Sequence, residues 1–299
     1  MRRRDFLWSA MGLTIDRAFS PAGARAAPTS GKRILFFTKS SGYEHSVIKK
    51  VGDQPSHAER VLSELAQRRG WTVTPEKDGR IFGSPGLAEY DAFFFYTTGD
   101  LTTAGTDGTP PMTREGKAAL LAAVRRGKGF VGAHCAADTF HSPGDLLAST
   151  GEKADPYIKM LGGEFIGHGR QQPAKISCAD PGFPGCAGIK NGFELVEEWY
   201  AFKDYQKDLH VILVQETAGM TTDGNDRVYE RPPYPATWAR RHGKGRVFYT
   251  SMGHREDVWT SPIFQTILAG GIGWTLGEVE AAATPDIARV TPGYAVIRR

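Results

Sequence analysis

The chain has 299 residues, of which 40% are hydrophobic and 23% are charged, a composition typical of a globular protein and not of a disordered or fibrous one. The net charge is +4, but residues 1–26 contain five arginines and two aspartates, so the rest of the chain carries only +1. A nearly neutral chain argues against nucleic acid as a partner, because that partner requires a basic face. No stretch approaches the roughly 18 continuous apolar residues of a membrane span.

The N-terminus, MRRRDFLWSAMG, contains two arginines, a spacer and Phe6-Leu7, followed by a modest apolar stretch and a small-residue cleavage site near Ala26. This pattern is typical of a twin-arginine export signal. Two charged residues interrupt the apolar stretch, and a disordered basic tail is the alternative. We expect residues 1–26 to be a signal read by the twin-arginine export machinery, which would place the protein in the periplasm or outside the cell. Residues 27–31 would then form a linker.

The next part of the chain alternates between strands and helices. RILFFT, WTVTPE, DAFFFYTT and GFVGAH are short apolar runs typical of buried parallel strands. Apolar residues at helical spacing predict a helix from about Asp53 to Arg69, and Thr113 is the expected cap of a second helix that ends at glycines. Strands that alternate with helices indicate a parallel sheet with right-handed crossovers.

After residue 150 the pattern changes to strands with few helices. AKISCAD, FELVEEWYAF, VILVQET, ATWARR and GRVFYTSM are strand-like, Gly162 and Gly163 are expected to end a helix, and SPIFQTILAGGIGWTL predicts a last one. We expect these strands to extend the same sheet in antiparallel fashion, because no linker separates the two halves. The prediction is one α/β domain over residues 32–280, followed by a tail over 281–299.

The three cysteines allow two interpretations in an exported protein. Cys178 and Cys186 are eight positions apart across the turn-rich ADPGFPG, so they either form a small disulfide or remain thiols, and the sequence leaves both open. Cys135 follows directly on His134 and is expected to be a small buried residue in a tight turn.

Two apolar runs each stop on a histidine, GFVGAHCAADTF at His134 and GRVFYTSMGHR at His254. In open α/β sheets ligands bind beyond the carboxyl ends of the strands, which is where both histidines are expected. The first run is also typical of a strand, a sharp turn and a helix, the arrangement that projects a reactive side chain in a nucleophile elbow. The sequence therefore predicts that His134 projects into a pocket.

Other polar residues follow predicted strands and join this candidate pocket. In EEWYAF, Glu198 and Tyr200 alternate on one face and Glu197 lies on the other, so only one of the two glutamates is expected inside. For every histidine the alternative is a loop residue that is hydrogen-bonded to the backbone. The further candidates are His45, Asp100, Asp138, His168 and Arg255, whereas His57, His141, His210 and His242 are assigned to the surface or to structural hydrogen bonds.

Six segments together resemble the ThuA-like family, named for trehalose utilisation, in the class I glutamine amidotransferase-like superfamily: FFTKSSGYEHS, GFVGAHCAADTFH, YIKMLGGEFIGHG, EEWYAF, PATWARRHGKGRVFYTSMGHREDVW and GIGWTLG. The resemblance spans residues 32–277 and implies a flavodoxin-like sandwich with a mostly parallel central sheet. It also favours Glu198 as the inward glutamate. At the elbow, true glutamine amidotransferases have cysteine and this chain has His134. Imidazole serves mainly as an acid, base or metal ligand, so we do not expect glutaminase activity.

The resemblance and the histidines together suggest an exported protein of carbohydrate utilisation, an acid–base hydrolase or lyase that acts on a sugar or an oxidised (keto) sugar. In this hypothesis His134 and His254 exchange protons with the substrate, and Asp138 orients an imidazole. Trp199 and Trp238 are considered only as candidates for sugar stacking. The expected catalytic residues are His134, Asp138, His254 and Glu198, and the expected substrate-binding residues are His45, Asp100, His168, Arg255 and Tyr200.

Two other functions remain open. One is a non-catalytic sugar-binding protein that uses the same cleft. The other is a metal-dependent hydrolase or lyase with His134, His168 and His254 as ligands. The chain has no His-Glu-x-x-His and no paired Cys-x-x-Cys, so a divalent metal is considered but not firmly predicted. No dinucleotide fingerprint or Walker pattern occurs, and no other cofactor is expected.

Overall fold

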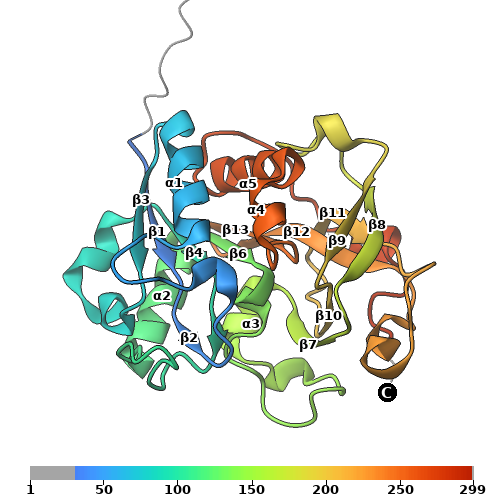
Figure 1. Cartoon of the computed structure of the whole chain (residues 1–299), viewed down its shortest axis with the longest axis horizontal. Helices are drawn as coiled ribbons and strands as arrows, with labels where there is room; N and C mark the ends of the chain where they lie inside the picture. Colours follow the sequence, from blue (N-terminus) through green and yellow to red (C-terminus); the bar gives the residue numbers. More distant parts are fainter. Residues whose placement is uncertain (1–30, 298–299) are drawn as a thin grey trace, which may run out of the picture.

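The computed structural model describes residues 31–297 and is built around a nine-stranded sheet (Figure 1). The strand order is β3-β1-β4-β6-β13-β12-β11-β8-β9. The first five strands of this order are parallel, and each later strand is antiparallel to its neighbour. The expected parallel sheet with an antiparallel extension is thus confirmed. The strands are β1 (Arg33–Phe37), β3 (Thr72–Glu76), β4 (Ala92–Phe95), β6 (Gly129–Ala133), β8 (Gln172–Cys178), β9 (Phe193–Glu197), β11 (His210–Gln215), β12 (Tyr234–His242) and β13 (Gly245–Thr250).

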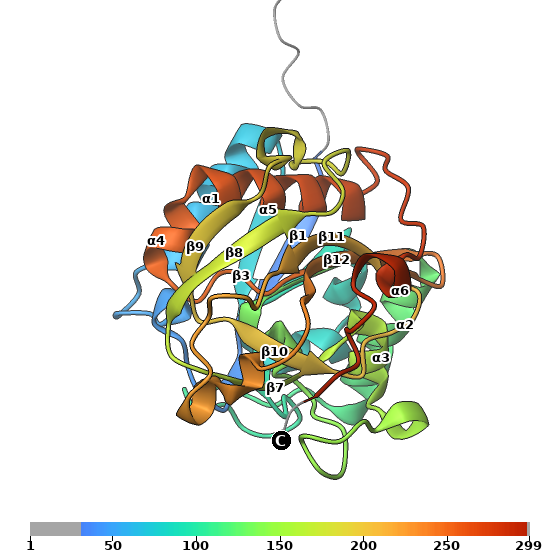
Figure 2. The same ribbon diagram turned by 90° about the vertical axis from the view of Figure 1, so that its right-hand side faces the viewer.

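Helices cover both faces of the sheet, as the two views together show (Figures 1 and 2). One face carries α1 (His57–Arg69), α4 (Glu256–Thr260) and α5 (Pro262–Thr275), and the other carries α2 (Arg114–Arg126) and α3 (Pro156–Leu161). Among the described residues, no helix has the length and apolar character needed to cross a membrane. The tail contains one short helix, α6 (Ile287–Val290), which contacts β11.

The first helix starts later than expected. Ser56 accepts a hydrogen bond from the backbone N–H of Glu59, and the Glu59 carboxylate accepts one from the backbone N–H of Ser56. This capping box fixes the first turn, so the helix begins at His57 and not at Asp53. The second helix begins as expected, because the side chain of Thr113 caps it.

The segment FELVEEWYAF is not one strand but two. β9 ends at Glu197, and β10 (Tyr200–Lys203) pairs with β7 (Glu164–His168) in a separate antiparallel sheet. Between them the fully buried Trp199 donates its indole N–H to the carbonyl of Gln172, 3.1 Å away. This contact turns the chain and leaves Glu198 at a corner between the two sheets. Two further strands, β2 (Ser40–Ser41) and β5 (Thr98–Gly99), form a short parallel pair.

Cys178 and Cys186 are free thiols in the structure, and their side chains form a hydrogen bond to each other. Cys135 is also free and is buried, as its place in a tight turn predicts. Trp199 and Trp238 are fully buried. Neither tryptophan can therefore stack on a sugar from solvent. The expected export signal over residues 1–26 lies outside the described residues.

Candidate active site

The chain makes a sharp turn where β6 ends, and His134 occupies it with a φ of 43°. This value lies in the left-handed region, which residues other than glycine rarely adopt. Tyr249 donates its hydroxyl to the carbonyl of His134 at 2.6 Å and holds the turn in place. Gly132 leaves the room that the turn needs, since a Cβ atom there would lie 3.0 Å from both Leu161 and Tyr249. The imidazole is consequently projected at the carboxyl edge of the sheet.

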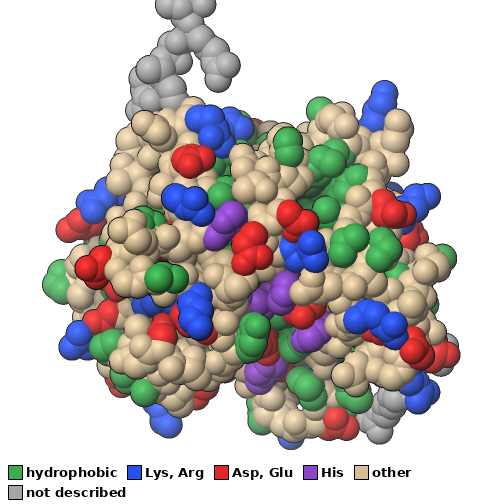
Figure 3. Space-filling view, in the orientation of Figure 1, with side chains coloured by type: hydrophobic (Ala, Val, Ile, Leu, Met, Phe, Trp, Pro, Cys, Tyr) green, Lys and Arg blue, Asp and Glu red, His purple; other side chains and the backbone are tan. Residues whose placement is uncertain are grey.

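Four side chains from different parts of the chain converge at this edge. His45 follows β1, His134 follows β6, His254 follows β13, and Glu198 lies at the corner between β9 and β10. One donor atom from each of these four residues lies within 4.8 Å of all the others. We call this set the four-residue cluster. Figure 3 shows histidine side chains gathered near the middle of one face of the molecule.

The position of the His134 ring is set by one backbone hydrogen bond. Its Nδ1 lies 2.9 Å from the carbonyl oxygen of Ser251. A carbonyl only accepts, so Nδ1 carries the proton and Nε2 presents a lone pair to the cluster in the neutral ring. Nε2 lies 3.5 Å from Glu198 Oε2 and 3.3 Å from Nδ1 of His254. In metalloproteins, backbone carbonyls often orient metal-bound histidines in the same way.

His45 supplies a nitrogen that has no partner. It is 3% exposed, and its Nδ1 makes no hydrogen bond with any described residue. Its ring centroid lies 5.0 Å from that of His134 and 5.2 Å from that of His254. Burial, and then the neighbouring imidazoles, lower the pKa of His45 to about 2. The ring is therefore neutral at physiological pH and has a lone pair to offer a ligand.

Glu198 is the carboxylate of the cluster. Its Oε2 lies 3.1 Å from Nδ1 of His254. Burial by itself would raise the pKa of Glu198, but the adjacent imidazoles of His134 and His254 outweigh it and hold the pKa well below its usual range. For His254, burial would lower the pKa, but the hydrogen bond with Glu198 outweighs it, so the pKa is raised. Glu198 is accordingly a carboxylate anion at neutral pH.

Both glutamates of the EEWYAF segment lie inside the protein, so the expectation of a single inward glutamate is wrong. Glu197 is fully buried, and it accepts hydrogen bonds from the backbone N–H groups of Gly253 and His254 at 2.8 and 3.1 Å. Because the chain turns directly after β9, the alternation of a regular strand stops between these residues, and both side chains can point inward. Burial raises the pKa of Glu197.

Three other expected residues border the cluster. Tyr200 lies against His134 with 4.0 Å between ring centroids, and its side chain is buried. His168 is at the rim, with a side chain that is 41% exposed and Nδ1 3.4 Å from Glu198 Oε1. Arg255 donates to Gln171 at 2.7 Å. A cavity of about 360 Å³ opens beside His254 and Arg255, and its lining also includes Ser46, Gln171, Glu256 and Asp257.

Two expected residues do not join the cluster. The Asp138 carboxylate binds His141, with Oδ1 2.6 Å from Nε2, and therefore does not orient His134 or His254 as expected. Asp100 accepts hydrogen bonds from the backbone N–H and the hydroxyl of Thr102 and stabilises its own loop. Both aspartates are held by short-range partners, which the sequence offers within three positions. His141 is thus hydrogen-bonded structurally, as expected for a histidine outside the site.

Three residues that support the site are not among those expected from the sequence. Glu197 was assigned to the wrong face, and no pattern in the sequence singles out Gln171 or Ser251. The carbonyl of Ser251 acts through the backbone, so its side-chain type carries no signal. Gln171 has its amide nitrogen 3.0 Å from Nε2 of His254, a residue 83 positions away.

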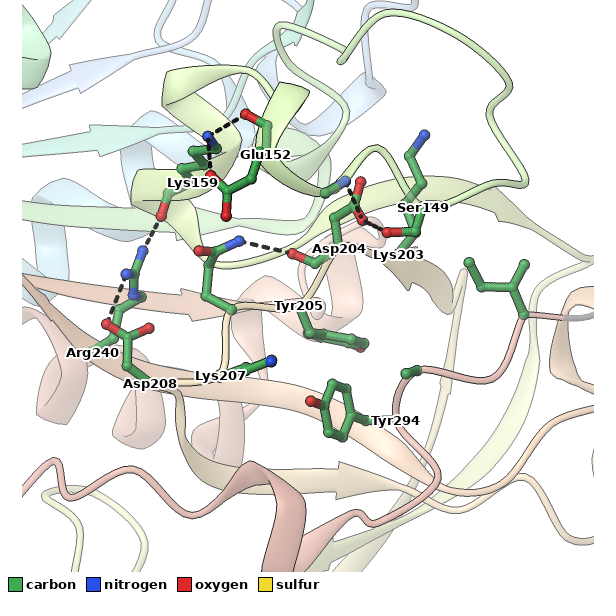
Figure 4. A pocket seen from close by; sticks show the side chains of 14 residues that line it. Ser149, Glu152, Lys159, Lys203, Asp204, Tyr205, Lys207, Asp208, Arg240 and Tyr294 are labelled. Carbon is green, nitrogen blue, oxygen red and sulfur yellow. Dashed lines mark hydrogen bonds and ion pairs between the residues drawn. The ribbon is translucent and has the colours of Figure 1, made fainter.

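A second, larger cavity of about 580 Å³ lies between α3, the segment after β10 and the end of the described chain (Figure 4). Its lining includes none of the residues expected in the site. Lys203 donates to the carbonyls of Asp145 and Ala148, and Arg240 is paired with Asp208. These cations are thus already bound within the protein. The side chains drawn in Figure 4 are Ser149, Glu152, Lys159, Lys203, Asp204, Tyr205, Lys207, Asp208, Arg240, Tyr294 and neighbouring residues.

A mostly parallel sheet with helices on both faces and a polar cluster at its carboxyl edge defines a flavodoxin-like α/β protein. A family model described as ThuA, trehalose utilisation, matches residues 33–275, and the chain belongs to this family. The family connects the chain with carbohydrate utilisation. A comparison with curated proteins gave no match.

Solved structures share this fold. A ThuA-like protein from Bacteroides uniformis is similar with a TM-score of 0.61 and 19% sequence identity, over 89% of this chain and 98% of that protein. A ThuA-like protein from Parabacteroides merdae is similar with a TM-score of 0.57 and 18% identity, over 86% of this chain and 94% of that protein. At these identities the likeness shows the fold alone.

Proposed function

We propose that the chain is an exported, divalent-metal-dependent hydrolase or lyase that acts on a sugar or an oxidised (keto) sugar derivative. The observation that carries this proposal is the four-residue cluster itself. Three imidazole nitrogens and one carboxylate oxygen, all from buried or half-buried residues, lie within 4.8 Å of one another. Side chains of this kind rarely gather in a protein interior without a shared ligand.

The donor set fits a transition metal such as Zn²⁺, which prefers imidazole nitrogen and carboxylate oxygen in a compact site. His45 and His134 each offer a lone pair, for the reasons of burial and of backbone hydrogen bonding given above. The ligand set differs from the one that the sequence suggested, because His45 and Glu198 replace His168. Nδ1 of His168 faces the carbonyl of Gly169 at 2.8 Å, which occupies that nitrogen.

When bound, such a cation would polarise a carbonyl or hydroxyl oxygen of the substrate. Residues of this chain would exclude water and bind the substrate hydroxyls. Tyr200 packs on His134 and keeps water from its inner side. His168 and Arg255 lie at the rim with polar atoms for substrate hydroxyls. The connection of the family with trehalose utilisation supports a sugar as the substrate.

Metal analysis tests this proposal. Wild-type protein, purified without chelator and without an affinity histidine tag, should contain close to one transition-metal ion per chain. His45→Ala and His254→Ala should lose the ion, whereas His242→Ala, at the far end of β12, should retain it. A wild-type metal content near zero, also after incubation with Zn²⁺, would overturn the proposal.

A second candidate is acid–base catalysis without a metal, and one contact favours it. Arg255 Nη1 donates to Gln171 Oε1 at 2.7 Å, which turns the amide nitrogen of Gln171 toward Nε2 of His254. Nε2 of His254 must then accept, so its Nδ1 carries the proton and donates to Glu198. A proton shared between an imidazole and a carboxylate suits general acid–base transfer.

Turnover measurements separate the two candidates. Disaccharides such as trehalose and their keto derivatives would be incubated with the enzyme before and after treatment with a chelator. The metal-dependent proposal expects turnover to be lost with the chelator and restored by added metal. Turnover that is insensitive to the chelator and absent in His254→Ala would establish the second candidate instead.

A further inference from the structure

One buried carboxylate joins the two turns that carry Glu198 and His254. Oε2 of Glu197 accepts from the N–H groups of Gly253 and His254, at 2.8 and 3.1 Å. Oε1 of the same side chain accepts from the N–H of Glu198 at 2.8 Å. The backbone of both cluster residues is therefore attached to a single side chain from the end of β9.

The turn that carries His254 is also held from its other side. The carbonyl of Gly253 accepts from the Tyr96 hydroxyl at 2.9 Å and from the indole N–H of Trp259 at 2.7 Å. Gly253 has a φ of 121°, a conformation that favours glycine. The residue before His254 is thus fixed at its N–H by Glu197 and at its C=O by two buried aromatic side chains.

We propose that Glu197 is a positioning residue, which holds His254 and Glu198 at the separation that a divalent cation requires. This inference rests on the proposed metal-dependent function. Glu197 does not reach the cluster with its own oxygens, since all three of its hydrogen bonds go to backbone N–H groups.

The substitution Glu197→Gln tests this role with almost no change in size. A glutamine has one acceptor oxygen and an NH₂ group, so it cannot accept from both turns at once. Whichever way the amide points, an N–H group of one turn faces the NH₂ group and loses its partner. One of the two cluster residues is then free to shift.

The experiment is a titration of the metal-free full chain with Co²⁺, followed by visible absorption and by calorimetry. Glu197→Gln is expected to weaken Co²⁺ binding about 10- to 100-fold, the usual effect of removing an outer-shell partner. The visible spectrum should change as well, because it reports the coordination geometry. Glu194→Gln, the same change at an exposed site on β9, should bind like the wild type.

Tyr96→Phe is a second variant, which removes only one hydroxyl from the other side of the Gly253 peptide. It should weaken Co²⁺ binding by less than Glu197→Gln does, and it keeps the inference testable if the first variant does not fold. Circular dichroism would establish folding before each titration. A merely structural role would lower the thermal midpoint and leave the affinity and spectrum of the folded protein unchanged.

The outcomes separate this inference from the proposal on which it rests. If the wild-type chain binds no Co²⁺, the metal-dependent function fails and the role of Glu197 fails with it. If the wild type binds and the folded variants bind equally well with the same spectrum, only the positioning role is overturned. Weaker binding with an altered spectrum in Glu197→Gln supports both.

Discussion

The imidazole of His141 lies between two carboxylates. Its Nε2 is 2.6 Å from Oδ1 of Asp138, and its Nδ1 is 3.1 Å from Oε1 of Glu164. Both ring nitrogens face acceptors, so the ring is held as an imidazolium ion. The hydrogen bond that His141 donates to Asp138, followed by the one that it donates to Glu164, raises the pKa of His141 to about 9.

The raised pKa of His141 predicts a pH dependence of stability. The folded-state pKa of about 9 lies above the ordinary value of 6.5, so the contribution of His141 is complete below pH 6.5 and is lost as the pH rises through about 9. Urea unfolding of wild type and His141→Gln should show a large difference in the free energy of unfolding at the lower pH and a small one at the higher pH. A constant difference across this range would contradict the assignment.

The strained turn at His134 predicts an unusual order of two variants. A φ of 43° is open to glycine, whereas any residue with a Cβ atom is disfavoured there by about 1–2 kcal/mol. His134→Gly should therefore be more stable than His134→Ala by about 1 kcal/mol, the reverse of the usual order. Thermal or urea unfolding measures this difference, and on the proposed metal-dependent function neither variant should bind the metal. An alanine variant as stable as the glycine variant would mean that the turn is not held as described.

The capping box of α1 predicts a modest loss of stability. Ser56→Ala removes the side-chain oxygen that accepts from the N–H of Glu59, which should lower the free energy of unfolding by about 1 kcal/mol. Ser63→Ala, in the exposed middle of the same helix, is the matched control and should be neutral or slightly stabilising. Equal effects of both substitutions on urea unfolding would count against the capping box.

The N-terminal sequence predicts a shorter mature protein. Cleavage near Ala26 should give a periplasmic or secreted form whose intact mass lacks the first 26 or so residues. Replacing the paired arginines of the MRRRDFL segment with lysines should block export through the twin-arginine route and leave the precursor inside the cell. A full-length chain outside the cytoplasm would argue against a cleaved signal.

The sequence predicted those elements whose formation depends on neighbours along the chain. Apolar runs marked the strands, Thr113 marked the start of α2, and the GFVGAHCAADTF run marked a sharp turn after β6. The start of α1 was missed by four residues, because the capping interaction at Ser56 determines it and the composition of the preceding loop does not. FELVEEWYAF predicts one strand, because its residues favour extended backbone throughout.

The sequence by itself also determined that histidines follow the strands, since each lies a few residues beyond an apolar run and parallel strands end at one edge. Only the tertiary structure decided which carboxylate meets which imidazole. Glu197 and Gly253 are 56 positions apart, and they meet only in the folded chain, where the end of β9 lies beside the turn after β13. Asp138 instead found a partner three residues away. Local sequence patterns fix the place of a residue on its strand, helix or turn. Its hydrogen-bond partner depends on the order of the strands and on which buried hydrogen bonds remain to be satisfied.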